Sequence, residues 1–135
     1  LLETGRIGDW ASHQIEHELS AIYDIAHGAG LAIIFPAWME YVYKTNINRF
    51  AQFAVRVWDI EYCFDFPEKT AAAGINKLKN FFIDLGLPTT LKDAGIPDDR
   101  IEEMASKCKM TNGDTVGTFV KLTRNDVLNI LKNAL

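Results

Sequence analysis

Apolar residues recur along this chain with the period of an α-helix, and no segment alternates apolar and polar positions as a half-buried strand would. Positions i, i+3, i+4 and i+7 share one face of a helix. The first predicted helix follows a cap at Asp9 and runs through Tyr23. The other predicted helices span 31–44, 47–58, 70–85, about 97–108 and about 123–131. The pattern therefore predicts an all-α fold, a multi-helix bundle.

Each predicted helix carries an apolar face that we expect to be buried, and the second is apolar on most sides. The expected inward residues are Phe50, Ala54, Val57, Trp58, Ile75, Leu78, Phe82, Leu85, Ile101, Met104, Ala105, Cys108, Val127, Leu128, Ile130 and Leu131. Pro36 is expected near the start of its helix or at a kink, because proline lacks the N–H that a helix interior uses. Pro97 is expected to begin a helix. Thr123 and Asp126 form a capping pair, and 110–117 is a polar loop.

Composition restricts the class of protein. With 135 residues, 48% of them apolar and 24% charged, the chain suits one globular domain rather than a disordered segment. The net charge of −4 and the pI near 5.3 argue against a nucleic-acid partner or an anionic membrane. The longest apolar run, 31–43, is interrupted by Glu40 and is too short to span a bilayer. We expect a cytoplasmic protein in which Cys63 and Cys108 are reduced, core-type thiols.

We expect no secretory leader at the amino end, because Glu3, Arg6 and Asp9 break any apolar stretch. The first residue is Leu1 rather than Met. We therefore expect either a processed product or a piece of a longer protein.

All three histidines lie within fifteen residues of one another, at positions 13, 17 and 27. His13 and His17 are four residues apart, so they project from one face of a helix. That spacing suits a metal ion but is also a common coincidence. On a straight helix His27 would lie about 21 Å beyond His13, too far for the two rings to share an ion.

A sharp reversal after the first helix would bring His27 back towards His13. Asp24 tolerates a helix end, and Gly28 and Gly30 adopt backbone conformations that are closed to other residues. The alternative is an ordinary interhelical turn in which His27 is a solvated residue. The sequence by itself leaves both arrangements open.

The histidines alone make an incomplete metal site. A catalytic Zn²⁺ or Fe²⁺ usually takes three or more protein ligands, often including a carboxylate. Glu16 and Glu18 flank His17, but we expect them to point to other faces of the helix and to form a solvated rim. The chain contains no HExxH motif and no adjacent His-Asp pair. By its own residues it holds half of a site.

The stretch GDWASHQIEHELSAIYDIAHGAGLAIIFPAWMEYVYK (residues 8–44) resembles the long motif of the iron-containing, or group III, alcohol dehydrogenases, and is most similar to their NAD(P)H-dependent butanol dehydrogenase branch. The resemblance rests on histidines at three fixed spacings, followed by His-Gly and a downstream Pro-Ala-Trp-Met. FFIDLGLPTTLKDAGIP and TVGTFVKLTRNDVLNIL resemble the tail of that branch, so the likeness covers essentially the whole chain.

The resemblance implies a two-domain, dehydroquinate-synthase-like enzyme, with an α/β dinucleotide-binding domain before an all-helical, metal-binding domain. Members of the family hold a divalent metal with one Asp and three His, of which the Asp and the first His come from a D-x-x-x-H helix upstream. The last two ligands are fourteen residues apart, and here that spacing falls on His13 and His27. The middle histidine of the family corresponds to His17, a non-ligand beside the substrate and nicotinamide that is suited to proton relay.

On this resemblance, residues 1–135 form the carboxy-terminal helical domain, incomplete at its amino end, and the dinucleotide-binding domain with its Gly-rich phosphate loop is missing. The implied activity is hydride transfer between NAD(P)(H) and a primary alcohol or aldehyde. Fe²⁺ is the expected metal and Zn²⁺ the alternative, and the chain alone is expected to be inactive. The expected partners are the small-molecule substrate, the chain's own nucleotide-binding domain and, in a homodimer, a second copy.

A different class of function stays open, a freestanding helical interaction domain in which the histidines are incidental. Loss of metal on replacement of His13 or His27 separates the two hypotheses. Tyr23 and Asp24 are candidates to orient a ligand imidazole, with a turn-stabilising role expected for Asp24.

Overall fold

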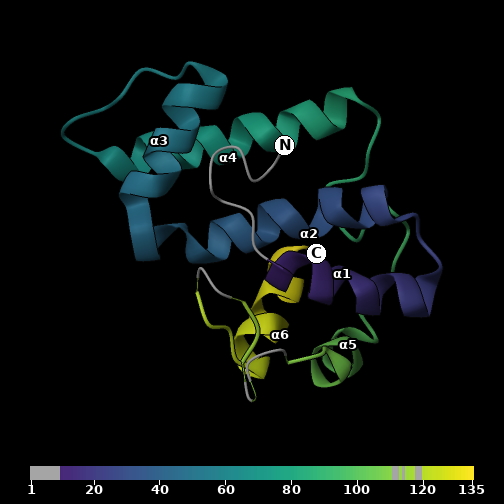
Figure 1. Cartoon of the computed structure of the whole chain (residues 1–135). Coiled ribbons are helices and arrows are strands. Elements are labelled where there is room, and N and C mark those ends of the chain that lie inside the picture. The colour runs from purple at the N-terminus through teal and green to yellow at the C-terminus, as the bar shows by residue number, and fades with distance from the viewer. Residues whose placement is uncertain (1–9, 111–112, 114, 118–119) are drawn as a thin grey trace.

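The computed structural model describes residues 10–110, 113, 115–117 and 120–135, and Figure 1 shows their arrangement. These described residues form six α-helices, one short 3₁₀-helix and no strand, with one isolated bridge between Val116 and Leu122. The elements are α1 (Trp10–Tyr23), α2 (His27–Val42), η2 (Tyr43–Asn46), α3 (Ile47–Trp58), α4 (Pro67–Asp84), α5 (Ile101–Lys107) and α6 (Arg124–Asn133). The predicted all-α fold is confirmed.

Helix α2 is the central element of the fold. In Figure 1, α3 and α4 pack together on one side of α2, whereas α1, α5 and α6 lie on the other. Ten of the sixteen residues of α2 are buried, because its surface is apolar on most sides and neighbours cover both flanks. The Trp38 ring lies near Phe35 and Phe50, with ring centroids 5.7 and 6.3 Å away. Pro36 is inside α2 rather than near its start.

Local capping explains where two of the helices begin. The Asn46 side chain accepts a hydrogen bond from the Arg49 N–H at 3.3 Å, and α3 ends at Trp58, before Asp59, which has a left-handed φ of 55°. The predicted span 47–58 is therefore confirmed. Thr123 and Asp126 form the predicted capping box at the start of α6, in which each side chain accepts from the backbone N–H of the other.

Three predicted helix starts are wrong. Helix α2 begins at His27, four residues earlier than predicted, so Gly28 and Gly30 lie within the helix. Helix α4 begins at Pro67, whose fixed φ suits a first helical turn. Helix α5 begins at Ile101, because 96–100 forms a turn in which Pro97 is not helical. The predicted cap Asp9 lies outside the described residues.

Most of the expected inward side chains are buried or pack against the core. The prediction that Val57 and Leu85 are buried is wrong. Val57, in the last turn of α3, is 51% exposed, and Leu85, just after α4, is 60% exposed. The predicted loop 110–117 lies partly outside the described residues. Both cysteines are free: Cys108 is buried, which raises the pKa of its thiol to about 11, and Cys63 is half-buried. Within the described part of the chain, no helix has both the length and the apolar character needed to cross a membrane.

Helix α2 is also joined to α6 by a polar contact. The Tyr41 hydroxyl donates a hydrogen bond to Asp126 Oδ1 at 2.6 Å, while the Thr123 N–H donates to Oδ2 of the same carboxylate at 2.8 Å. Burial raises the pKa of Asp126, but the hydrogen bonds from Tyr41 and Thr123 outweigh burial and hold this pKa below its usual value. One carboxylate thus caps α6 and fixes it against α2.

We predict that Asp126→Asn destabilises the chain by about 1 kcal/mol near neutral pH, the usual cost of losing a cap. Because the folded state lowers the pKa of Asp126, its contribution is present above the unfolded pKa of about 3.9 and is lost as pH falls through the folded value. The difference in unfolding free energy between wild type and Asp126→Asn should therefore shrink below about pH 4, as urea titrations at several pH values would show. A difference that stays constant down to pH 3 would contradict this account. Asp98→Asn, at an exposed carboxylate, is the control.

We predict that Gly74→Ala weakens the contact between α3 and α4. A Cβ at Gly74 would lie 2.9 Å from the Cα of Ala54, a backbone atom that cannot move aside without shifting α3. The expected loss of unfolding free energy is about 1–3 kcal/mol. Gly28→Ala is the matched control, since a Cβ there meets nothing within 4 Å and should leave stability unchanged or raise it by up to about 1 kcal/mol. Equal effects of the two substitutions in urea unfolding would rule out the steric explanation.

Candidate metal centre

The chain reverses direction between α1 and α2 over residues 24–26. Asp24 has a φ of 52°, a left-handed conformation that Asp adopts more readily than most residues, and its N–H donates to the Ser20 carbonyl at 2.9 Å. Helix α2 then begins at His27 and packs back along α1, as Figure 1 shows. The predicted reversal is present, but Asp24 makes it and the two glycines do not.

This reversal gathers the three imidazole rings. The ring centroids of His13 and His27 are 5.6 Å apart, and those of His17 and His27 are 6.0 Å apart. Two imidazoles that each bind one ion at about 2 Å, at a tetrahedral angle, have ring centroids about 5 Å apart. The separation of His13 from His27 is therefore close to what a shared ion requires.

The cluster is open to solvent on one side. His13 is half-buried, whereas His17 is exposed and the side chain of His27 is 51% exposed. An ion or a small molecule can therefore approach the rings without a rearrangement of the helices.

The prediction that Glu16 belongs to a solvated rim is wrong. Its side chain is fully buried, with one carboxylate oxygen bound to Nδ1 of His27 and the other accepting a hydrogen bond from the Ser20 hydroxyl. The carboxylate enters the interface because Gly30 on α2 has no side chain in its way. The pattern held a clue, since position 16 falls on the buried stripe of α1 that includes Ile15 and Leu19. Glu18, by contrast, is half-buried.

The donor set fits a divalent metal. Among the described residues, Glu16, His17 and His27 each offer a ligand atom within 4.8 Å of the others, and the His13 ring stands next to His27. Imidazole nitrogens together with a carboxylate suit Fe²⁺ and Zn²⁺ alike. The histidines predicted from the sequence thus lie together, and Glu16 is the neighbouring side chain that sequence reasoning missed.

Two other predicted neighbours do not orient an imidazole. Asp24 is exposed and makes the turn. The pKa of Tyr23 is raised first by desolvation of its hydroxyl and then by the negative charge of Asp99, which precedes α5. Among the described residues the buried Tyr23 hydroxyl has no hydrogen-bond partner, so it holds no imidazole.

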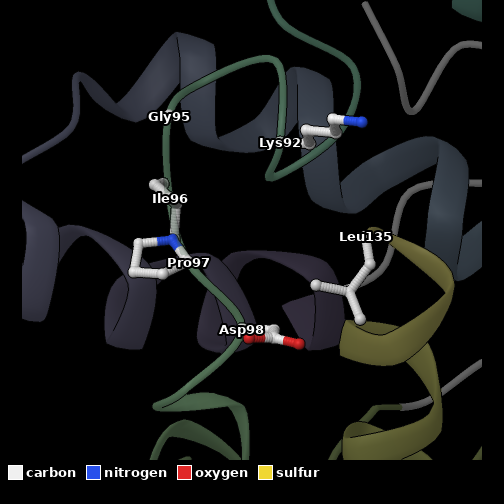
Figure 2. A pocket seen from close by; sticks show the side chains of 6 residues that line it. All are labelled: Lys92, Gly95, Ile96, Pro97, Asp98 and Leu135. Atoms are coloured by element: carbon white, nitrogen blue, oxygen red, sulfur yellow. The ribbon is translucent and has the colours of Figure 1, made fainter.

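A separate pocket is lined by none of the histidines. Figure 2 shows this pocket, which has a volume of about 420 Å³ and lies between the segment before α5 and the residue Leu135 after α6. Its lining residues are Lys92, Gly95, Ile96, Pro97, Asp98 and Leu135. With a single acidic side chain and no imidazole, this lining offers no comparable donor set.

Comparison with known proteins places this chain in a family. The sequence model described as "Fe-containing alcohol dehydrogenase family, C-terminal" matches residues 2–135. The chain is 47% identical over 135 residues to the "Probable NADH-dependent butanol dehydrogenase 1" of Bacillus subtilis, covering 100% of this chain and 34% of that protein. It is 38% identical to the "NADH-dependent butanol dehydrogenase A" of Clostridium acetobutylicum, covering 99% and 34%.

Solved structures agree with the sequence comparison. The crystal structure of NADH-dependent butanol dehydrogenase A from Thermotoga maritima superposes with a TM-score of 0.84 at 44% identity, covering 96% of this chain and 33% of that one. The substrate- and cofactor-free aldehyde reductase YqhD of Escherichia coli gives 0.85 at 31% identity, covering 94% and 33%. The chain thus spans about a third of the length of these relatives. Its sequence and its fold show that the chain belongs to the Fe-containing alcohol dehydrogenase family and matches the C-terminal part of that family.

Proposed function

We propose that this chain is the metal-binding part of an alcohol dehydrogenase or aldehyde reductase that transfers a hydride between NAD(P)(H) and a primary alcohol or aldehyde. The observation that carries the proposal is the 5.6 Å separation of the His13 and His27 rings, which are fourteen residues apart in sequence. The names of the relatives, butanol dehydrogenases and an aldehyde reductase, support the class of substrate.

The helical domain works, on this proposal, with an amino-terminal α/β dinucleotide-binding domain. That domain would bind the nicotinamide cofactor and supply the remaining metal ligands, the Asp and His of a D-x-x-x-H helix. The share of about a third that this chain covers in its relatives leaves room for such a domain. The side of the histidine cluster that is open to solvent is the side available for docking it.

His13 and His27 are the proposed metal ligands of this chain, and Fe²⁺ is the proposed metal. When bound, the metal supplies Lewis-acid polarisation of the substrate oxygen. The two imidazoles hold their position because α1 and α2 are packed side by side, so little conformational freedom is lost when an ion binds.

His17 is the proposed proton relay. It is exposed, it lies one helical turn from His13, and its ring centroid is 6.0 Å from that of His27. A neutral ring nitrogen of His17 can accept the hydroxyl proton of an alcohol and release it to solvent, and in the reverse direction it can deliver a proton to the product.

These roles predict different outcomes for the three histidines. In a chimaera that joins the amino-terminal part of the Bacillus subtilis relative to this chain, His13→Ala and His27→Ala should each lose bound metal and lower NADH oxidation with butanal by about 100-fold or more. His17→Ala should keep the metal and lower kcat by about 100-fold. Metal analysis and steady-state kinetics measure both, with Gln14→Ala on the same helix as the control.

The alternative of an interaction domain predicts that neither metal content nor turnover changes in any of these variants, and that outcome would overturn the proposal. If the chimaera does not fold, a second measurement tests the same ligands. The 135-residue chain and its His13→Ala and His27→Ala variants are titrated with Co²⁺ and followed by visible absorption. Equal binding by all three would also reject the proposed ligands.

A further inference from the structure

Glu16 has a feature that the proposed ligand set leaves unused. Among the residues that the structure describes, it is the one buried residue with an acidic or basic side chain, and its exposed fraction is 0%. Taking a carboxylate out of water is costly unless hydrogen bonds replace the lost solvent. The hydrogen-bond partners of Glu16 therefore indicate why this carboxylate is buried.

Both carboxylate oxygens of Glu16 are engaged. Oε2 is bound to Nδ1 of His27, and Oε1 accepts from the Ser20 hydroxyl. Ser20 Oγ also lies 3.1 Å from the carbonyl oxygen of Ile25, in the turn between the two helices. Glu16, on α1, thus contacts His27, the first residue of α2, and is linked through Ser20 to the turn between the two helices.

The backbone of α2 makes room for this carboxylate. A Cβ built at Gly30 would lie 2.8 Å from Cδ of Glu16 and closer still to Oε1. Any larger residue at position 30 would push Glu16 away from His27. The glycine is inside a helix, where it is unfavourable relative to alanine by roughly 1 kcal/mol, so its small size is used here for the close approach.

An imidazole that presents Nδ1 to a carboxylate keeps its proton on Nδ1 and leaves the lone pair on Nε2. We propose that Glu16 is a positioning residue for His27, because it holds the ring through Nδ1 and so presents Nε2 to the metal. This inference rests on the proposed function, since it assigns a task to Glu16 only if His27 binds a metal. It adds a residue outside the ligand set whose removal changes metal affinity without removing a ligand.

The geometry favours positioning over direct ligation by Glu16. Its two oxygens already have partners on protein atoms, and the side chain is fully buried, whereas the His27 side chain is 51% exposed. Glu16 therefore stands behind His27 as seen from solvent.

The test uses the 135-residue chain with Glu16→Met, which keeps an unbranched side chain of similar length and removes both acceptors. Long-range ¹⁵N–¹H NMR on the metal-free chain, recorded at a pH where the ¹⁵N shifts show the His27 ring to be neutral, should show its proton on Nδ1 in the wild type. In Glu16→Met the proton should move mainly to Nε2, which an unrestrained neutral imidazole prefers. A wild-type proton on Nε2 would overturn the proposal.

Titration with Co²⁺ supplies the second readout. Glu16→Met should lower the affinity by about 10- to 100-fold, and Glu16→Gln, which still hydrogen-bonds but carries no charge, should lower it less. At saturating Co²⁺ the visible spectrum should keep its wild-type shape, because the ligands are the same. Glu18→Met, which removes the same charge two residues away, is the matched control and should bind as the wild type does. Circular dichroism checks that each variant is folded.

The outcomes separate this proposal from the proposed function. An affinity of Glu16→Met within two-fold of the wild type would reject positioning while leaving the ligands intact. A changed Co²⁺ spectrum at saturation would make Glu16 a ligand and would also overturn it. If the wild-type chain alone takes up no Co²⁺, the same titrations are made in the chimaera, which also supplies the amino-terminal ligands, and absence of metal there rejects the proposed function. The position of the His27 proton in the 135-residue chain still decides whether Glu16 orients that ring.

Discussion

The packing of α1 against α2 determines where every histidine of the chain lies. Both helices would carry their imidazoles far apart if the backbone continued straight, and the left-handed Asp24 ends α1 so that α2 returns along it. This places the His13 and His27 rings 5.6 Å apart. Because α2 is the buried centre of the fold, with α3 and α4 on one side and α1, α5 and α6 on the other, the position of His27 is fixed by the whole core rather than by a loop.

The same interface contains a buried charge. Glu16 would destabilise the fold by an amount on the order of several kcal/mol if its carboxylate had no partners, and it has two, His27 and Ser20. Stability and site geometry are thus coupled at one residue, since the contact that satisfies the carboxylate also fixes the imidazole. On the proposed function, this coupling would give α1 and α2 a shared role in positioning His27 for a metal ion.

Much of this architecture could be predicted from local sequence, and the exceptions have one cause. The bounds of α3 and the capping box of α6 follow from residues that interact with their own neighbours, such as Asn46 and Thr123. The start of α2 was missed because Ala26 offers no side-chain cap, so only packing sets that boundary. The burial of Glu16 was missed because it depends on Gly30, which is close in space but lies on the next helix. The convergence of the histidines was left open by the residues alone and was suggested by the family resemblance.

The central claim is that one cation binds between His13 and His27 across the α1–α2 reversal. Diffraction from crystals of the chimaera grown with Co²⁺, recorded at the cobalt absorption edge, tests this claim most directly. The account predicts an anomalous peak about 2 Å from Nε2 of both His13 and His27, with the Glu16 carboxylate on Nδ1 of His27. A peak bound by Glu16 and His17 without His13, or no peak at the histidines at saturating Co²⁺, would contradict it.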